Sequence, residues 1–159
     1  MSPAEPPPEA LRQAFLTTAY GPPGARMRLC PERSRPPSWA DRGQSWAIVT
    51  AWNPGACRAE HRANLHAHAR LLTQVLAARL SPVAARNGTG EWTEEGLLIP
   101  GASLKQTLAW TRSFGQEAAL WGVGARAALV WRTGRIERGW AVAVTEDPVT
   151  ESAVAEDEG

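Results

Sequence analysis

The order of the apolar segments is the feature of this 159-residue chain that most restricts its fold. From Ser45 to Gly122 the patterns of a strand, a helix, two strands, a helix and a strand follow one another. The two helical segments, residues 59–80 and 102–115, separate strands rich in apolar residues. This order is typical of the split βαβ unit. We therefore predict an α+β fold, a ferredoxin-like sandwich with both helices on one face of an antiparallel sheet.

Further elements extend this unit at both ends. Residues 8–20 place apolar side chains at helical spacing, which predicts a short N-terminal helix. Residues 117–132 have the pattern of a hairpin and residues 138–144 that of a last strand, so extra C-terminal strands should lengthen the sheet. In the second helix of the unit, Ser103 is the expected N-cap and Gly115 the expected C-terminal stop.

Length and charge indicate one domain with two flanking segments. Apolar residues make up 43% of the chain, which suits a globular domain, and we place that domain at residues 10–145. The proline-rich residues 1–9 and the tail at residues 146–159 can bury little apolar surface, so both are expected to be disordered. The tail carries six acidic residues and no basic one, so the rest of the chain holds a formal charge of +7.

The sequence favours the cytoplasm and gives no sign of a membrane protein. It contains no apolar run of about 18 residues that could cross a bilayer. Its first residues are acidic and proline-rich, whereas a secretory signal needs a basic start and an apolar stretch. Cys30 and Cys57 lack the spacing of metal ligands and are interpreted as ordinary thiols. The three histidines also lack metal-ligand spacing, so we expect neither a metal nor a cofactor.

Several polar residues interrupt the apolar patterns at one edge of the predicted fold. On the helix at residues 61–80, His61, Asn64 and His68 fall within the apolar stripe, where buried polar groups need partners. In the ferredoxin-like topology the segments around these residues meet at one edge of the sheet. The residues expected to form a ligand-binding cluster there are Asn53, His61, Asn64, His68, Trp92, Glu94, Glu95 and Gln116. The structural alternative is that these side chains only tie the helix to a neighbouring loop.

The same segments carry a family resemblance. Its motifs are TAY at residues 18–20, TAWNPG at 50–55, Asn64 with His68 and Leu71, WTEEGLLIPG at 92–101 and FGQEAALWG at 114–122. From roughly Ala14 to Trp131 the chain resembles the uncharacterised bacterial family catalogued as domain of unknown function 3293. It departs from the family pattern at Ala63, where a glutamate is common, and at Gly96, where a serine is common. The resemblance sharpens the choice of site residues and implies no activity.

The residue types of the cluster favour a binding module. Asn and Gln side chains donate and accept hydrogen bonds without being nucleophiles, so Asn53, Asn64 and Gln116 suit the recognition of a small polar molecule or a peptide. On this hypothesis Asn64→Ala should abolish ligand binding and leave the thermal midpoint nearly unchanged. A large loss of stability would instead indicate a structural role for the cluster.

Two other functions stay open. The first is a hydrolase or transferase in which His68 and Glu95 handle protons as candidate catalytic residues. Glu94 and Glu95 should point to opposite faces of a strand, so one of them at most can serve the cluster. The second is nucleic-acid binding through Arg126, Arg132, Arg135 and Arg138, with the acidic tail competing for that surface. We also expect a homodimer, because the sheet face opposite the helices would otherwise expose apolar surface.

Overall fold

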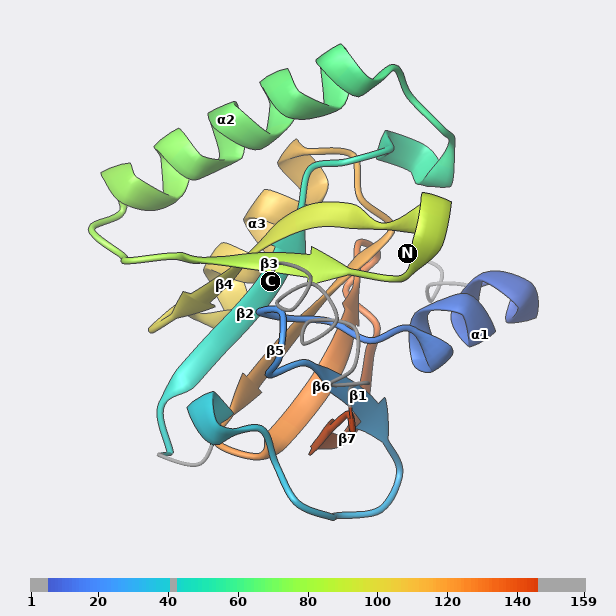
Figure 1. Ribbon diagram of the computed structural model, residues 1–159, viewed down its shortest axis with the longest axis vertical. Helices are drawn as coiled ribbons and strands as arrows, with labels where there is room; N and C mark the ends of the chain where they lie inside the picture. Colours follow the sequence, from blue (N-terminus) through green and yellow to red (C-terminus); the bar gives the residue numbers. More distant parts are fainter. Residues whose placement is uncertain (1–5, 41–42, 146–159) are drawn as a thin grey trace, which may run out of the picture.

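The computed structural model describes residues 6–40 and 43–145 as a mixed α/β structure (Figure 1). Its α-helices are α1 (Glu9–Thr17), α2 (His61–Ala77) and α3 (Leu104–Ser113). Its strands are β1 (Met27–Cys30), β2 (Ser45–Thr50), β3 (Val83–Asn87), β4 (Glu94–Pro100), β5 (Ala118–Val123), β6 (Arg126–Trp131) and β7 (Ile136–Ala143). The expected tail at 146–159 and residues 1–5 of the expected N-terminal segment lie outside the described residues, and the domain boundaries stay predictions.

All seven strands form one antiparallel sheet in the order β1-β7-β6-β5-β2-β4-β3. Helix α2 connects β2 to β3 and α3 connects β4 to β5, so each helix joins two strands that are separated by a third. The α+β class and the antiparallel sheet predicted from the sequence are confirmed. The N-terminal helix and the extra strands are also present.

Helices α2 and α3 cover one face of the central strands. Val49 of β2, Leu97 of β4 and Ala119 of β5 point to this face and pack with Leu71 and Val75 of α2, with Trp110 of α3 and with Phe114 just after it. Helix α3 begins with a capping box, in which Ser103 and Gln106 bond each other's backbone N–H groups, and the chain leaves the helix at Gly115 with φ +67°. The predicted N-cap and stop are confirmed.

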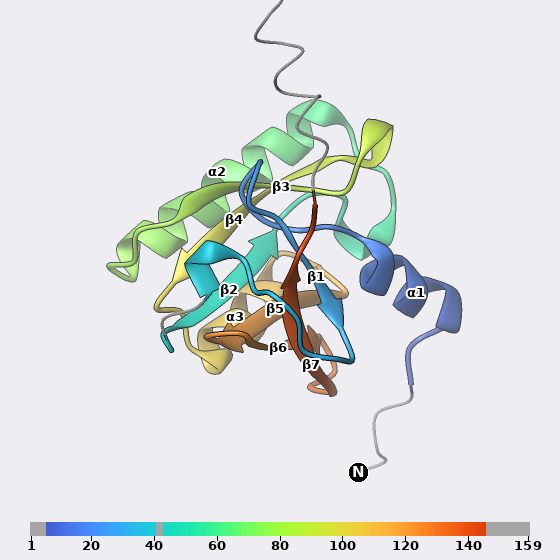
Figure 2. The ribbon, with the colours of Figure 1, turned by 60° about the horizontal axis from the view of Figure 1, so that its bottom comes forward.

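The other face of the sheet encloses a second core because the sheet curls (Figure 2). The segment from Ala19 to Gly21 joins the two outer strands: Tyr20 exchanges backbone hydrogen bonds with Met27 of β1, and the carbonyls of Ala19 and Gly21 accept from the amides of Gly88 and Arg86. Trp46, Ile48, Leu98, Leu120 and Leu129 fill the interior. A two-layer ferredoxin-like sandwich is therefore not confirmed, since this face is neither flat nor open. The apolar face on which the expected homodimer rested packs against the chain itself.

Helix α1 packs on the rim of the curled sheet through apolar side chains, a ring contact and an ion pair. Phe15 meets the ring of Trp131 edge to face, with 5.3 Å between centroids. Arg12 Nε donates to Glu137 Oε1 at 2.7 Å, and Trp131 Nε1 donates to Glu137 Oε2 at 2.8 Å. Leu11 and Leu16 of α1 also pack against the core as partly buried residues. No residue of α1 is fully buried, so all of these contacts together determine how firmly the helix is held.

Replacing Glu137 with glutamine should loosen α1 in a pH-dependent way. Burial acts to raise the pKa of Glu137, but the hydrogen bonds from Arg12 and Trp131, together with the positive charges of Arg12 and Arg135, outweigh it and the pKa is lowered. The charged carboxylate thus stabilises the folded state above its ordinary pKa of about 4.5, and this contribution is lost as the pH falls through the folded-state pKa. Amide exchange in α1 should be faster in Glu137→Gln than in wild type at neutral pH and equal in acid. Equal exchange at neutral pH would contradict this role.

Candidate functional site

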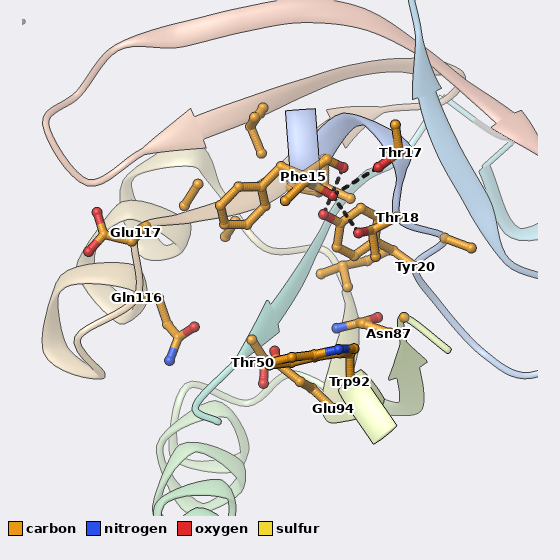
Figure 3. A pocket seen from close by; sticks show the side chains of 18 of the residues that line it. Phe15, Thr17, Thr18, Tyr20, Thr50, Asn87, Trp92, Glu94, Gln116 and Glu117 are labelled. Atoms are coloured by element: carbon orange, nitrogen blue, oxygen red, sulfur yellow. Dashed lines mark hydrogen bonds between the residues drawn. The ribbon is translucent and has the colours of Figure 1, made fainter. Parts of the chain in front are cut away.

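A cavity of about 780 Å³ opens at one end of the curled sheet, beside α1. Its apolar floor comes from Ile48, Leu120 and Leu129, which belong to the core inside the curl. In Figure 3, Thr50, Asn87, Trp92 and Glu94 gather at one side of the pocket, Phe15 and Tyr20 lie at another, and Gln116 comes from a third direction. Polar groups from distant parts of the chain therefore converge above an apolar floor.

The pairing of β3 with β4 places a carboxylate and an amide side by side in this cavity. Glu94 pairs with Asn87, so both side chains are on one face of the sheet and both line the cavity. Glu95 pairs with Arg86 on the other face, where their charged groups lie 3.5 Å apart. The sequence expectation that the two glutamates point in opposite directions is confirmed, and Glu94 is the one in the cavity.

Asn53 links the end of β2 to both α2 and Glu94. Its side-chain amide donates to Glu94 Oε2 at 3.0 Å, and its Oδ1 accepts from the amide of Ala59 and from Asn64 Nδ2 at 3.0 and 2.9 Å. Asn64 Oδ1 accepts in return from the backbone N–H of Asn53 at 2.8 Å. Asn53 adopts a left-handed conformation with φ +49°, which Asn tolerates better than most residues. These contacts fix the position of the amide that touches Glu94.

The mouth of the cavity carries an exposed aromatic ring with a cation stacked on it. Trp92 has 66% of its surface exposed, and the guanidinium of Arg58 lies 4.9 Å from the centre of its ring. Arg58 also pairs with Glu91 at 3.6 Å. Gln116 is buried and donates to the carbonyls of Trp52 and Phe114, so it fastens the β2 end to the end of α3.

Two ionisable groups in the cavity have perturbed pKa values. Burial raises the pKa of Glu94, and the hydrogen bond from Asn53 opposes the shift. Burial also raises the pKa of the Tyr20 hydroxyl, and the charge of Glu94 adds to that shift. The Tyr20 hydroxyl donates to the carbonyl of Phe15 at 2.9 Å. The cavity therefore holds a partly desolvated carboxylate close to a phenol that stays protonated.

Comparison with protein families identifies the part of the chain that supplies most of these groups. Residues 49–119 match the family described as Protein of unknown function (DUF3293). The family that the motifs indicate is thus confirmed over this segment. Curated proteins and solved structures give no match.

The DUF3293 segment contributes one side of the cavity, and the N-terminal region contributes the other. Thr50, Asn53, Asn87, Glu94 and Gln116 all come from residues 49–119. The wall made by α1 and the strand-like residues after it lies outside the segment and includes Phe15, Thr18 and Tyr20. The pocket is therefore complete only when α1 is docked.

Four residues of the expected cluster lie outside the cavity lining, and four line it. Asn53, Trp92, Glu94 and Gln116 line the cavity; His61, Asn64, His68 and Glu95 do not, as far as the described residues go. The ring of His61 packs on Trp52 with 5.6 Å between centroids. His68 Nδ1 is buried and has no hydrogen-bond partner among the described residues. The proposed catalytic pair of His68 and Glu95 is therefore not part of the pocket geometry.

The hydrogen bonds of Asn64 favour a structural role, in which its side chain ties α2 to the neighbouring loop. The residue is 4% exposed and both ends of its amide are engaged by Asn53, as described above. Asn64→Ala should therefore lower stability, because it leaves the partly buried N–H of Asn53 without its acceptor. The earlier expectation of an unchanged thermal midpoint does not fit this geometry.

Sequence reasoning missed Asn87, Tyr20 and Thr50. Tyr20 lies in the TAY motif of the family resemblance, and this motif was the available signal. Asn87 was not among the residues expected in the cluster, although the pairing of β3 with β4 places it opposite Glu94. Gly96 makes room for it, since a Cβ there would lie 2.8 Å from Asn87 Nδ2 and 3.0 Å from the carbonyl of Val49. The glycine at position 96, where the family often has serine, therefore leaves space that the side chain of Asn87 occupies.

The remaining expectations concern metals, membranes and nucleic acids. Within residues 6–40 and 43–145, no group of three or more His, Cys, Asp or Glu side chains could hold a metal ion. Over the same residues, no helix combines the length and the apolar character needed to cross a bilayer. Of the arginines expected to bind nucleic acid, Arg126 lies over the ring of Trp140 and Arg132 offers its carbonyl to Arg112. The cytoplasmic location stays a prediction.

Proposed function

We propose that this protein binds a small molecule in the cavity beside α1, with the polar part of the ligand at Glu94 and Asn87 and its apolar part over Ile48, Leu120 and Leu129. The observation that carries the proposal is the composition of the cavity: an apolar floor with a few polar groups converging from separate elements is typical of ligand sites. The mouth of a curled sheet is also a common place for such sites. Catalysis is not required by this geometry.

The energetics of the polar groups support binding rather than a purely structural role. A structural cluster would satisfy its polar groups internally, as Asn53 and Asn64 do. Glu94 instead lines an open cavity with a raised pKa, and Trp92 leaves most of its ring exposed at the entrance. Such groups cost stability or solubility in the free protein and gain partners when a ligand enters.

A substitution that fills the cavity should abolish binding without unfolding the protein. Ala14 lies on the exposed side of α1 and lines the cavity, so the ring of Ala14→Trp can occupy the pocket. Ala10 is one turn earlier, equally exposed and outside the lining, which makes Ala10→Trp the matched control. In a thermal-shift screen of small amines, amino acids and nucleotides, compounds that raise the midpoint of wild type and of Ala10→Trp should have no effect on Ala14→Trp. Equal shifts in all three proteins would place the site elsewhere.

The enzyme hypothesis would need a different pair of residues from the one first considered. Glu94 and Tyr20 are the ionisable groups with perturbed pKa values in the cavity, whereas His68 and Glu95 lie outside its lining. Within the described residues, no group of three or more His, Cys, Asp or Glu side chains accompanies them that could hold a metal ion. Binding is therefore the function that the geometry supports best.

A further inference from the structure

The polar side of the pocket holds the carboxylate of Glu94, and no cationic side chain among the described residues is recorded as donating a hydrogen bond to it. Glu94 accepts its hydrogen bond from the uncharged amide of Asn53. Glu95, one residue later, illustrates the contrast, since it faces Arg86 on the other side of the sheet. Burial makes the ionised form of Glu94 costly, and its pKa is raised accordingly. A positive charge brought by a ligand would offset that cost.

The arginines of the cavity wall are directed at other acceptors. Arg26, Arg28 and Arg58 contribute to the lining. Their guanidinium groups donate to the backbone carbonyls of Arg86, Gly88, Thr17 and Glu91, and that of Arg58 also forms an ion pair with the Glu91 carboxylate at 3.6 Å. Glu94 instead lies beside Asn87 in the strand pairing.

Aromatic rings line the same cavity as Glu94. Phe15, Tyr20 and Trp92 all line the cavity, and an aromatic face attracts a cation through its quadrupole. Trp92 shows this attraction directly, because it already holds the guanidinium of Arg58 over its ring. A carboxylate within an aromatic-lined, partly desolvated pocket is the usual protein environment for an organic ammonium group.

We infer that the ligand of this pocket is an organic cation, a primary or secondary amine on an apolar or aromatic body, whose ammonium group contacts Glu94. Its body would lie on the floor formed by Ile48, Leu120 and Leu129. The inference rests on the proposed function and names the ligand class of the same pocket. The competing outcome is an anionic ligand held by the arginines of the cavity wall, Arg26, Arg28 and Arg58.

Three probes of similar shape and different charge test the inference on the full-length protein. They are 2-phenylethylamine, its neutral counterpart 2-phenylethanol and the anion 3-phenylpropionate, each titrated calorimetrically into wild type, Glu94→Gln and Glu95→Gln. Glutamine at position 94 can still accept the hydrogen bond from Asn53, so the fold is retained and only the charge is removed. Glu95→Gln removes the adjacent charge outside the pocket and serves as the matched control.

The amine should bind wild type about tenfold or more tightly than the alcohol, and the anion should bind most weakly. This preference should disappear in Glu94→Gln and persist in Glu95→Gln. Equal binding of amine and alcohol by wild type, or a preference that survives Glu94→Gln, would overturn the amine assignment while leaving the pocket intact. Tightest binding of 3-phenylpropionate would assign the ligand to the arginines. If none of the probes binds wild type, or if each binds Ala14→Trp as well as wild type, the pocket itself is refuted along with the assignment.

Discussion

Replacing Asn53 with alanine should lower the free energy of unfolding by about 3 kcal/mol and release the start of α2 from the site. The substitution removes three side-chain hydrogen bonds, to Glu94, to the amide of Ala59 and to Asn64. It leaves the buried Nδ2 of Asn64 without an acceptor, which costs more than the mean value of a hydrogen bond. It also puts alanine at φ +49°, a conformation less favourable for alanine than for asparagine.

Urea unfolding of two variants separates these contributions. Asn53→Gly removes the same hydrogen bonds but adopts positive φ without strain, so it should be less destabilising than Asn53→Ala by roughly 1 kcal/mol. Both variants should also lose ligand affinity, because Glu94 loses the amide that orients it. A loss of under about 1 kcal/mol in Asn53→Ala would show that the contacts of Asn53 contribute little to the fold.

Gly122→Ala is expected to be at least as damaging, for a reason unrelated to the pocket. Gly122 lies in β5, paired with Trp46 of β2 and Ala127 of β6. A Cβ at this position would lie 2.3 Å from the backbone carbonyl of Arg126 and 2.5 Å from the ring of Trp46, both far inside contact distance. The ring could shift, but the backbone of a hydrogen-bonded strand pair cannot move without breaking the sheet. We expect a loss of about 3 kcal/mol or more in chemical denaturation.

A second substitution tests whether the stability loss in Gly122→Ala comes from the clash with the backbone carbonyl of Arg126. Trp46→Leu would remove the ring but keep an apolar side chain in the curl, where Trp46 is fully buried. Added to Gly122→Ala, it should restore little stability, because the clash with the Arg126 carbonyl persists. Full rescue by Trp46→Leu would mean that side-chain crowding alone makes glycine necessary there.

The secondary structure was predictable because its patterns are local. The periodicity of α2, the N-cap at Ser103 and the hairpin and last strand of β5 to β7 each depend on residues close in sequence, and each element appears where it was expected. The curl of the sheet was not predictable in this way. It depends on a three-residue segment, Ala19 to Gly21, that pairs with β1 on one side and β3 on the other, and no periodic pattern marks a segment so short.

The residues of the candidate site were predictable only in part. Asn53, Trp92, Glu94 and Gln116 were placed at one edge by topology, and all four line the cavity. The helical stripe identified Asn64 and His68 as inward-facing but could not distinguish a side chain that reaches the pocket from one that holds a loop. Tyr20 and Phe15 come from the region that closes the curl, so their place in the pocket followed from the long-range pairing that the sequence pattern did not reveal.

Chemical-shift mapping can decide whether the cavity beside α1 binds a ligand. The ¹⁵N-labelled full-length protein would be titrated with 2-phenylethylamine and followed by two-dimensional NMR. Binding in the cavity should give saturable shifts at the amides of Thr50, Asn87 and Gln116 and leave the amides around Trp140 unchanged. Shifts centred on Trp140, or no saturable shift at millimolar probe, would contradict it.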